Sequence, residues 1–129
     1  MTKINLISIL IAILITGCSN DLAEESQRTI NQGEVIGIEG DNDTFAWLGI
    51  PFAEPPVGNL RWKAPLQSKA FYSKFEANKF ADACFQSGGL FGGGEDWIGS
   101  EDCLYLNVWT QAWSTEELRE KKVPVMVWI

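Results

Sequence analysis

Histidine is absent from this chain of 129 residues. Acyl transfer at a serine needs a base beside the nucleophile, usually an imidazole, and a third group that orients this base. The chain also lacks the sequence G-x-S-x-G, which forms the sharp turn that exposes many nucleophilic serines. We therefore predict no catalytic residue of this kind within the 129 residues.

Basic residues are also few. The chain has 10 lysines and arginines against 17 acidic residues, a net charge of −7, and its basic residues are scattered. Binding to nucleic acid needs grouped cations that neutralise phosphates, so we exclude nucleic acid as a partner. Without histidine or a Cys-x-x-Cys pair no metal site is expected. The glycine run at 92–94 lacks the lysine and spacing of a phosphate loop, so we predict no cofactor.

The N-terminus has the pattern of an export signal. Lys3 is followed by an apolar run over residues 4–15, which is too short for an ordinary transmembrane helix. Thr16 and Gly17 then precede Cys18, and this arrangement resembles the lipobox of bacterial lipoproteins. The resemblance implies a signal peptide over residues 1–17 and a lipid on Cys18. The alternative is a plain secretory signal with an incidental cysteine.

A lipid on Cys18 would make a membrane the partner of the mature chain. Residues 18–32 are mainly polar, so we expect them to form a tether between the lipid and the fold. The expected location is the cell envelope, and Ser19 after the cysteine resembles the signal for the outer membrane rather than the inner membrane.

Two of the three cysteines remain if Cys18 carries a lipid. Cys84 and Cys103 would then be exported to an oxidising compartment, where pairing is expected. A disulfide between them would close the glycine-rich loop 85–102 and stabilise the fold by roughly 3 kcal/mol. Two free buried thiols are the alternative.

Short strands joined by turns dominate the rest of the chain. The run 34–39 and the apolar run 44–50 flank the turn residues 40–43, which predicts a β-hairpin. Residues 104–109 alternate as a strand does, and residues 123–129 are apolar on both faces, as in a buried central strand. Residues 114–117 have a capping-box pattern that predicts a short helical turn.

Four blocks together resemble the type-B carboxylesterase and cholinesterase family. They are residues 49–65 (GIPFAEPPVGNLRWKAP), residues 83–84, residues 100–110 (SEDCLYLNVWT) and residues 124–129. The resemblance implies an α/β fold. Residues 33–129 would be the N-terminal part of an α/β-hydrolase domain, with an antiparallel hairpin at the edge and the first strands of the central sheet, and the domain would be incomplete.

The resemblance also implies roles for individual residues. Cys84 and Cys103 match the cysteines of the family's first disulfide, and Arg61 and Glu101 match the two residues of a salt bridge of the family beneath that disulfide. A bidentate Arg–carboxylate pair could pin the proline-rich loop to the base of the disulfide loop. Without the resemblance, Arg61 and Glu101 would be ordinary surface charges. Trp97 lies where cholinesterases place an aromatic that meets cationic substrate, but the spacing differs and a packing role is favoured.

The function implied is that of an exported, lipid-anchored carboxylic-ester hydrolase acting on a small-molecule ester. In this family an oxyanion loop, a nucleophilic serine, an acid and a histidine follow the strand that resembles residues 124–129, so we expect them beyond Ile129 and expect the chain alone to be inactive. The alternative is a non-catalytic, cholinesterase-like binding or adhesion module. A short lipoprotein unrelated to esterases is a third interpretation.

Overall fold

The structure is a computed structural model that describes residues 22–88 and 97–129. It contains short strands and few helices. In chain order the elements are η2 (Glu24–Ser26), β1 (Arg28–Ile30), β2 (Gly33–Ile36), β3 (Ile38–Gly40), β4 (Thr44–Pro51), η3 (Gly58–Leu60), β5 (Phe75–Glu76), β6 (Gln86–Ser87), β7 (Trp97–Ile98), β8 (Tyr105–Gln111) and α1 (Thr115–Glu120), where η denotes a 3₁₀ helix.

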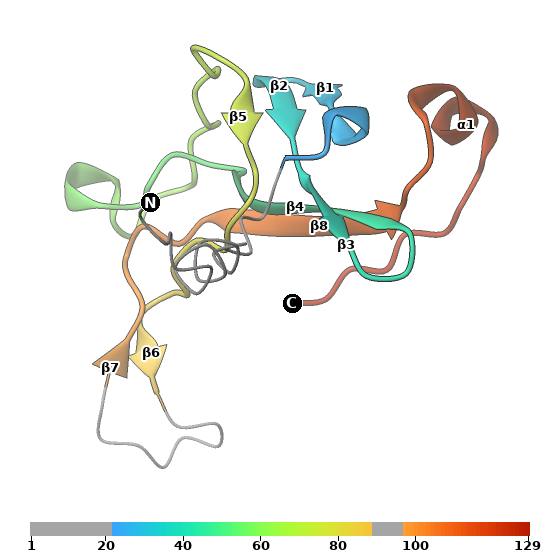
Figure 1. Ribbon diagram of the computed structural model, residues 1–129. Coiled ribbons are helices and arrows are strands. Elements are labelled where there is room, and N and C mark those ends of the chain that lie inside the picture. Colours follow the sequence, from blue (N-terminus) through green and yellow to red (C-terminus); the bar gives the residue numbers. More distant parts are fainter. Residues whose placement is uncertain (1–21, 89–96) are drawn as a thin grey trace, which may run out of the picture.

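The strands form three small sheets (Figure 1). In the first, β1 pairs antiparallel with β2, and β2 pairs parallel with β5. In the second, β4 lies between β3 and β8 and is antiparallel to both. The third is the pair β6 and β7, which projects away from the other two sheets (Figure 1). The two larger sheets therefore build the body of the fold, and the β6–β7 pair lies outside it.

The predicted hairpin is confirmed, with one difference. Strands β3 and β4 form it, and Asn42 and Asp43 have positive φ angles of 56° and 54° in its turn, a conformation that Asn and Asp tolerate. The run 34–39, however, is two strands in two sheets, divided at Gly37. A Cβ at Gly37 would lie 2.2 Å from the carbonyl oxygen of Ala46. Glycine therefore allows the close approach at which the chain passes from one sheet to the other.

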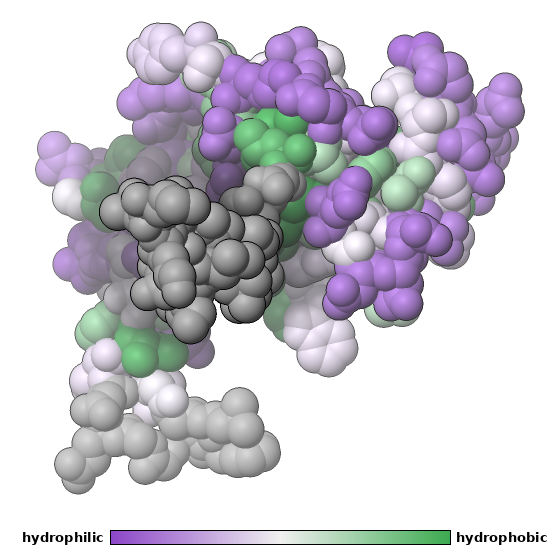
Figure 2. Space-filling model, viewed as in Figure 1, coloured by the Kyte–Doolittle hydropathy of each residue, from purple (hydrophilic) through white to green (hydrophobic). Residues whose placement is uncertain are grey.

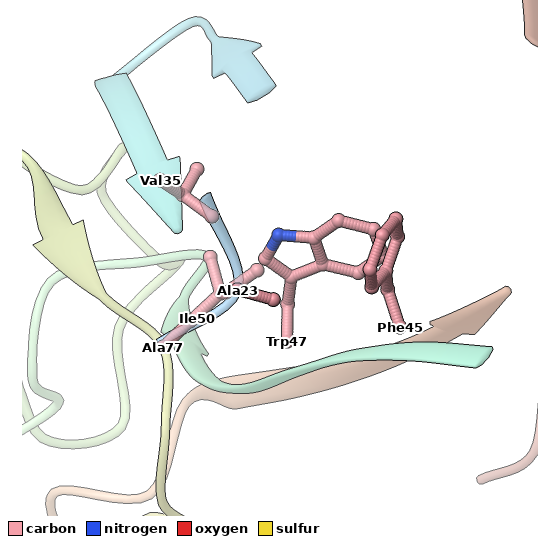
Figure 3. Packing of buried hydrophobic residues seen from close by; sticks show 6 residues of the cluster. All are labelled: Ala23, Val35, Phe45, Trp47, Ile50 and Ala77. Carbon is pink, nitrogen blue, oxygen red and sulfur yellow. The ribbon is translucent and has the colours of Figure 1, made fainter. Parts of the chain in front are cut away.

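Strand β4 supplies the centre of the core. Phe45 and Trp47 face the first sheet and pack with four other buried residues (Figure 3), namely Ala23, Val35, Ile50 and Ala77. The register of β4 against β8 shifts between Trp47 and Ile50, and Gly49 lies in this irregularity with φ = +72°. Such a bulge adds one residue to the alternation, which returns Ile50 to the face of Phe45 and Trp47.

The described part of the expected tether, residues 22–32, belongs to the fold. Of residues 18–32, those from 22 onward belong to the fold: Ala23 is 5% exposed, Ser26 is fully buried and β1 pairs with β2. Polar composition suggested a tether, but the backbone of this segment finds partners in β2 and at Gly37. Residues 1–21, with the proposed signal peptide and Cys18, lie outside the described residues.

The C-terminal stretch contains the predicted helical turn. The capping box at Ser114 is present, and its side chain accepts a hydrogen bond from the backbone of Glu117. Residues 123–129 have the apolar pattern of a buried central strand, but here they form no strand, and Val125, Met126 and Trp128 are 83%, 92% and 94% exposed. A strand needs a neighbour to accept its backbone hydrogen bonds, and none of the described strands pairs with this segment.

Candidate functional site at the base of the disulfide loop

A disulfide joins the two cysteines that the family resemblance paired. The sulfurs of Cys84 and Cys103 are bonded, and their Cα atoms are 4.9 Å apart. Backbone pairing supports the same junction, because Ser100 donates to the carbonyl of Ala83 at 2.9 Å and Phe85 donates to the carbonyl of Ser100 at 3.2 Å. The two ends of the loop are thus held together covalently and by a short ladder of hydrogen bonds.

Arg61 and Glu101 form an ion pair next to this junction. The distance from Arg61 Nη2 to Glu101 Oε1 is 2.6 Å, and both side chains are about half exposed, at 49% and 46%. Arg61 ends the turn of η3 in the proline-rich loop, and Glu101 lies two residues before Cys103. The ion pair therefore connects the proline-rich loop to the base of the disulfide loop, as the resemblance implied.

The residue after Arg61 has an unusual backbone. Trp62 has a φ of +59° and its side chain is 94% exposed, while the guanidinium carbon of Arg61 lies 5.8 Å from the centre of its ring. A left-handed conformation is uncommon for a bulky residue. It turns the chain directly after Arg61 and leaves the indole beside the guanidinium, within the range of a cation–π interaction.

Two aromatic rings stack at the β6–β7 pair, one from the residue before β6 and one from the first residue of β7. Phe85 and Trp97 stack with their centroids 5.2 Å apart and their planes at 9°, and they are 61% and 66% exposed. Trp97 therefore packs on Phe85, in agreement with the packing role favoured above. Glycines 92–94 lie outside the described residues.

The adjacent acids Glu101 and Asp102 serve different partners. Glu101 pairs with Arg61, whereas Asp102 lies beside Tyr105. Burial raises the pKa of the Tyr105 hydroxyl, and its hydrogen bond with Asp102 raises this pKa further. Two carboxylates engaged in this way hold the local structure, and they do not form the facing pair that glycoside hydrolysis requires.

The described residues offer no assembled catalytic group at this site. Residues 22–88 and 97–129 contain no cluster of three or more acidic or cysteine side chains that could hold a metal ion. Nor does this part of the chain contain a helix long and apolar enough to cross a membrane. A surface hollow of about 480 Å³ lies over the loop 68–76, but none of the five site residues, Arg61, Cys84, Trp97, Glu101 and Cys103, lines it. The contacts that the described residues make at the site are a disulfide, an ion pair and a pair of stacked rings.

Sequence reasoning did not identify Arg28 as a central residue. Its guanidinium donates to the carbonyls of Glu25 and Trp113 at 2.8 and 2.7 Å, and it lies 5.4 Å from the ring of Trp47. Burial lowers the pKa of Arg28, and the nearby Glu116 opposes this effect. No local pattern could have predicted the contact, because Trp113 lies 85 residues further along the chain.

Sequence comparison finds relatives that are named as esterases, cholinesterases and lipases. The chain is 42% identical over 102 residues to a fumonisin B1 esterase of Sphingopyxis macrogoltabida, covering 79% of this chain and 18% of that protein. It is 42% identical over 106 residues to an acetylcholinesterase of Electrophorus electricus, covering 76% of this chain and 16% of the relative. Lipase 1 of Geotrichum candidum is 36% identical over 135 aligned positions, which cover 84% of this chain and 23% of the lipase.

Solved structures give the same result for the fold. A PNB esterase superposes with a TM-score of 0.59 at 33% identity, covering 68% of this chain and 18% of the esterase. A carboxylesterase of Geobacillus stearothermophilus superposes with a TM-score of 0.55 at 32% identity, covering 66% and 16%. These neighbours are esterases of the α/β-hydrolase fold, so the predicted fold class is confirmed.

The chain spans about a fifth of the length of these relatives, between 16% and 23%. A model of the carboxylesterase family matches residues 24–129, which include η2, the hairpin, the disulfide loop and β8. This match covers most of the chain and contains every described residue of the site. The chain belongs to the carboxylesterase family.

Proposed function

We propose that this chain is the N-terminal portion of an exported, lipid-anchored carboxylic-ester hydrolase. The family match over residues 24–129 carries the proposal. Relatives named as a fumonisin B1 esterase, an acetylcholinesterase and a lipase align with 79%, 76% and 84% of the chain, and all three names describe proteins that cleave carboxylic esters. The reaction class proposed for this chain is therefore ester hydrolysis, without a choice of ester.

The described residues would support the chemistry and not perform it. Acyl transfer needs a nucleophile, a base and donors for the oxyanion, and the 129 residues contain no histidine that could act as the base. The disulfide closes the loop 85–102, and the Arg61–Glu101 pair connects the proline-rich loop to the base of this loop. A rigid frame of this kind is what positions catalytic groups that other parts of a hydrolase supply.

The test is to read the coding DNA beyond Ile129 in frame and to express the whole reading frame in an oxidising compartment. We expect a His-Gly-Gly sequence soon after Ile129 and a G-x-S-x-G sequence later. The whole protein should then hydrolyse p-nitrophenyl butyrate, and replacing the serine of G-x-S-x-G by alanine should abolish the activity. Residues 19–129 alone should be inactive with the same ester.

The other outcome would favour the non-catalytic alternative. A reading frame that continues the fold but lacks the serine or the histidine would overturn the hydrolase proposal and favour a cholinesterase-like binding or adhesion module. Saturable hydrolysis by residues 19–129, lost on changing one serine, would overturn the frame role assigned to them.

The lipid anchor is proposed from Cys18 and the residues before it. Metabolic labelling with a radioactive fatty acid should label the protein and place it in the membrane fraction. Cys18→Ser should remove both the label and the membrane association, with Cys84 and Cys103 unchanged. Equal labelling of the two forms would contradict the anchor.

A further inference from the structure

The described part of the chain begins at Leu22, four residues after Cys18. Leu22 forms an antiparallel bridge with Ile38, and the backbone of Ala23 donates to the carbonyl of Gly37 at 3.0 Å. Only residues 19–21 separate this attachment from Cys18. The chain is therefore fixed to the junction of β2 and β3 almost as soon as it leaves the proposed lipid.

Buried contacts of the next residues oppose any release of this attachment. The hydroxyl of Ser26 accepts a hydrogen bond from the backbone of Gly37 at 2.7 Å, and the carbonyl of Ser26 accepts one from the indole of Trp47 at 3.0 Å. Arg28 holds the same segment to the carbonyl of Trp113. A buried donor left without its partner costs about 1–3 kcal/mol, so detaching residues 22–28 to lengthen the tether is unfavourable.

The length of the tether limits how the fold can be oriented. Four Cα steps separate Cys18 from Leu22, and an extended chain covers at most about 3.3–3.6 Å per residue, or roughly 14 Å in all. A compact unit of the length of residues 22–129 would alone have a radius of gyration of about 13 Å, and the whole hydrolase proposed above would be larger. The tether is therefore about as long as the radius of the unit that it holds, so the unit cannot turn its far side to the membrane.

We infer that the side of the fold around Leu22 and Ile38, here called the anchor side, lies against the lipid headgroups. This inference rests on the proposed lipid at Cys18. A flexible tether of 15 residues, as the sequence alone suggested, would have a root-mean-square length of about 20 Å and would let the fold turn freely. The structure attaches the chain to the fold from Leu22 onward, so at most residues 19–21 could act as a free link, and this limit defines the orientation.

The anchor side carries exposed acidic residues, so its contact with the lipid headgroups would depend on the short link to Cys18. Glu24, Glu25 and Glu39 are exposed near Leu22 and Ile38, and Figure 2 shows hydrophilic residues gathered over the β3–β4 turn and α1. Lys74 is 3.5 Å from Glu24 and offsets one of these charges. Anionic lipids attract basic segments, so this acidic side gains nothing from them. Lengthening the tether should therefore allow the fold to leave the bilayer surface.

Two labelled variants of the lipidated protein test this orientation. Glu39→Cys places a bimane label on the anchor side, and Gln86→Cys places the same label on the β6–β7 pair, which projects from the body of the fold (Figure 1). Both residues are exposed. The proteins are reconstituted in phosphatidylcholine vesicles that contain a lipid with a nitroxide on its headgroup, which quenches bimane only at short range.

We expect strong quenching at Glu39→Cys and little at Gln86→Cys. A second pair of variants carries 12 Gly and Ser residues inserted after Asp21, which adds about 20 Å of flexible reach. The insertion should reduce the quenching at Glu39→Cys to the level of the Gln86→Cys site. It should leave fatty-acid labelling and membrane association unchanged.

The outcomes separate the inference from the anchor itself. Equal quenching at the two sites in a lipidated protein, or quenching at Glu39→Cys that survives the insertion, would overturn the orientation and leave the lipid anchor in place. A protein without fatty-acid label that stays in solution would overturn the anchor, and with it the orientation.

Discussion

Two apolar stretches of this chain have opposite surroundings. Strand β4, Thr44–Pro51, has β3 on one edge and β8 on the other, and six of its eight residues are buried. Residues 123–129 are as apolar, but all of them are exposed and none forms a strand. An apolar run therefore becomes a buried strand only where neighbouring strands accept its backbone hydrogen bonds and other residues cover its side chains.

The same contrast divides the described chain into two regions. All its buried apolar residues lie between Ala23 and Ala77, here called the N-terminal region, and residues 104–129, the C-terminal region, contain none. Leu106, Val108 and Trp109 of β8 are 38%, 40% and 57% exposed although β8 pairs with β4. Exposed apolar segments of this kind invite association with other strands. We therefore expect the C-terminal region to make the chain prone to aggregation when nothing covers it.

Replacing one tryptophan in each region tests this division most directly and should give the largest difference in stability. Trp47 is 4% exposed in the core, whereas Trp128 is 94% exposed. Trp47→Ala should lower the free energy of unfolding by about 3–5 kcal/mol, because it leaves a cavity and removes the partner of the Ser26 carbonyl. Trp128→Ala should change it by less than about 0.5 kcal/mol. Urea unfolding followed by circular dichroism measures both, and similar losses would contradict the division.

Removing the disulfide should have the next largest effect, because it closes the loop between the two regions. The double variant Cys84→Ala with Cys103→Ala should lose about 3 kcal/mol of stability, the value for a loop of this length. Wild-type protein in reductant should match the variant, and the variant itself should not respond to reductant. An unchanged urea midpoint for the variant would show that the loop is held without the bond.

Local signals in the sequence predicted local structure. The turn residues 40–43 and the flanking strands gave the hairpin, and the pattern at Ser114 gave the capping box of α1. Each depends on residues a few positions apart, where chain geometry permits few alternatives. The positions of Cys84, Cys103, Arg61 and Glu101 came instead from the family resemblance, since spacing alone does not fix which distant side chains meet.

Distant contacts explain what the sequence could not predict. The polar segment 22–32 resembled a tether. In the structure, however, Arg28 donates a hydrogen bond to the carbonyl of Trp113, and the hydroxyl of Ser26 accepts one from the backbone of Gly37. The sheet change at Gly37 and the bulge at Gly49 likewise depend on the approach of other backbone segments. The composition of a segment contains none of this information, so the polar residues 22–32 were wrongly assigned to a tether.

A serine pair tests whether the N-terminal segment belongs to the core. Ser26 is fully buried and accepts the hydrogen bond from Gly37, whereas Ser73 is exposed. Ser26→Ala leaves a buried backbone donor unpaired and should cost about 1–3 kcal/mol. Ser73→Ala should be neutral within the error of urea unfolding. Equal stability of the two variants would contradict the assignment of residues 22–32 to the core.

The smallest effect is expected from the Arg61–Glu101 pair, because both side chains are about half exposed. Water screens such pairs, which typically contribute about 0.2–1 kcal/mol, and salt weakens them further. A double-mutant cycle with Arg61→Gln and Glu101→Gln should therefore give a coupling energy in this range that falls as salt is added. Arg61→Lys should recover part of it, since a lysine keeps the charge and loses the planar guanidinium beside Trp62.

The same double-mutant cycle can be repeated in the variant that lacks the disulfide. With the Cys84–Cys103 bond intact, Glu101 lies two residues from a covalent link, so its backbone is already restrained when its side chain meets Arg61. In the Cys84→Ala and Cys103→Ala background that link is lost, and the pair must hold the loop with no covalent help. We expect the coupling to fall there, because a looser loop loses more entropy when the two side chains meet. A coupling that is unchanged or larger without the disulfide would contradict this expectation and show that the ion pair does not depend on the covalent bond.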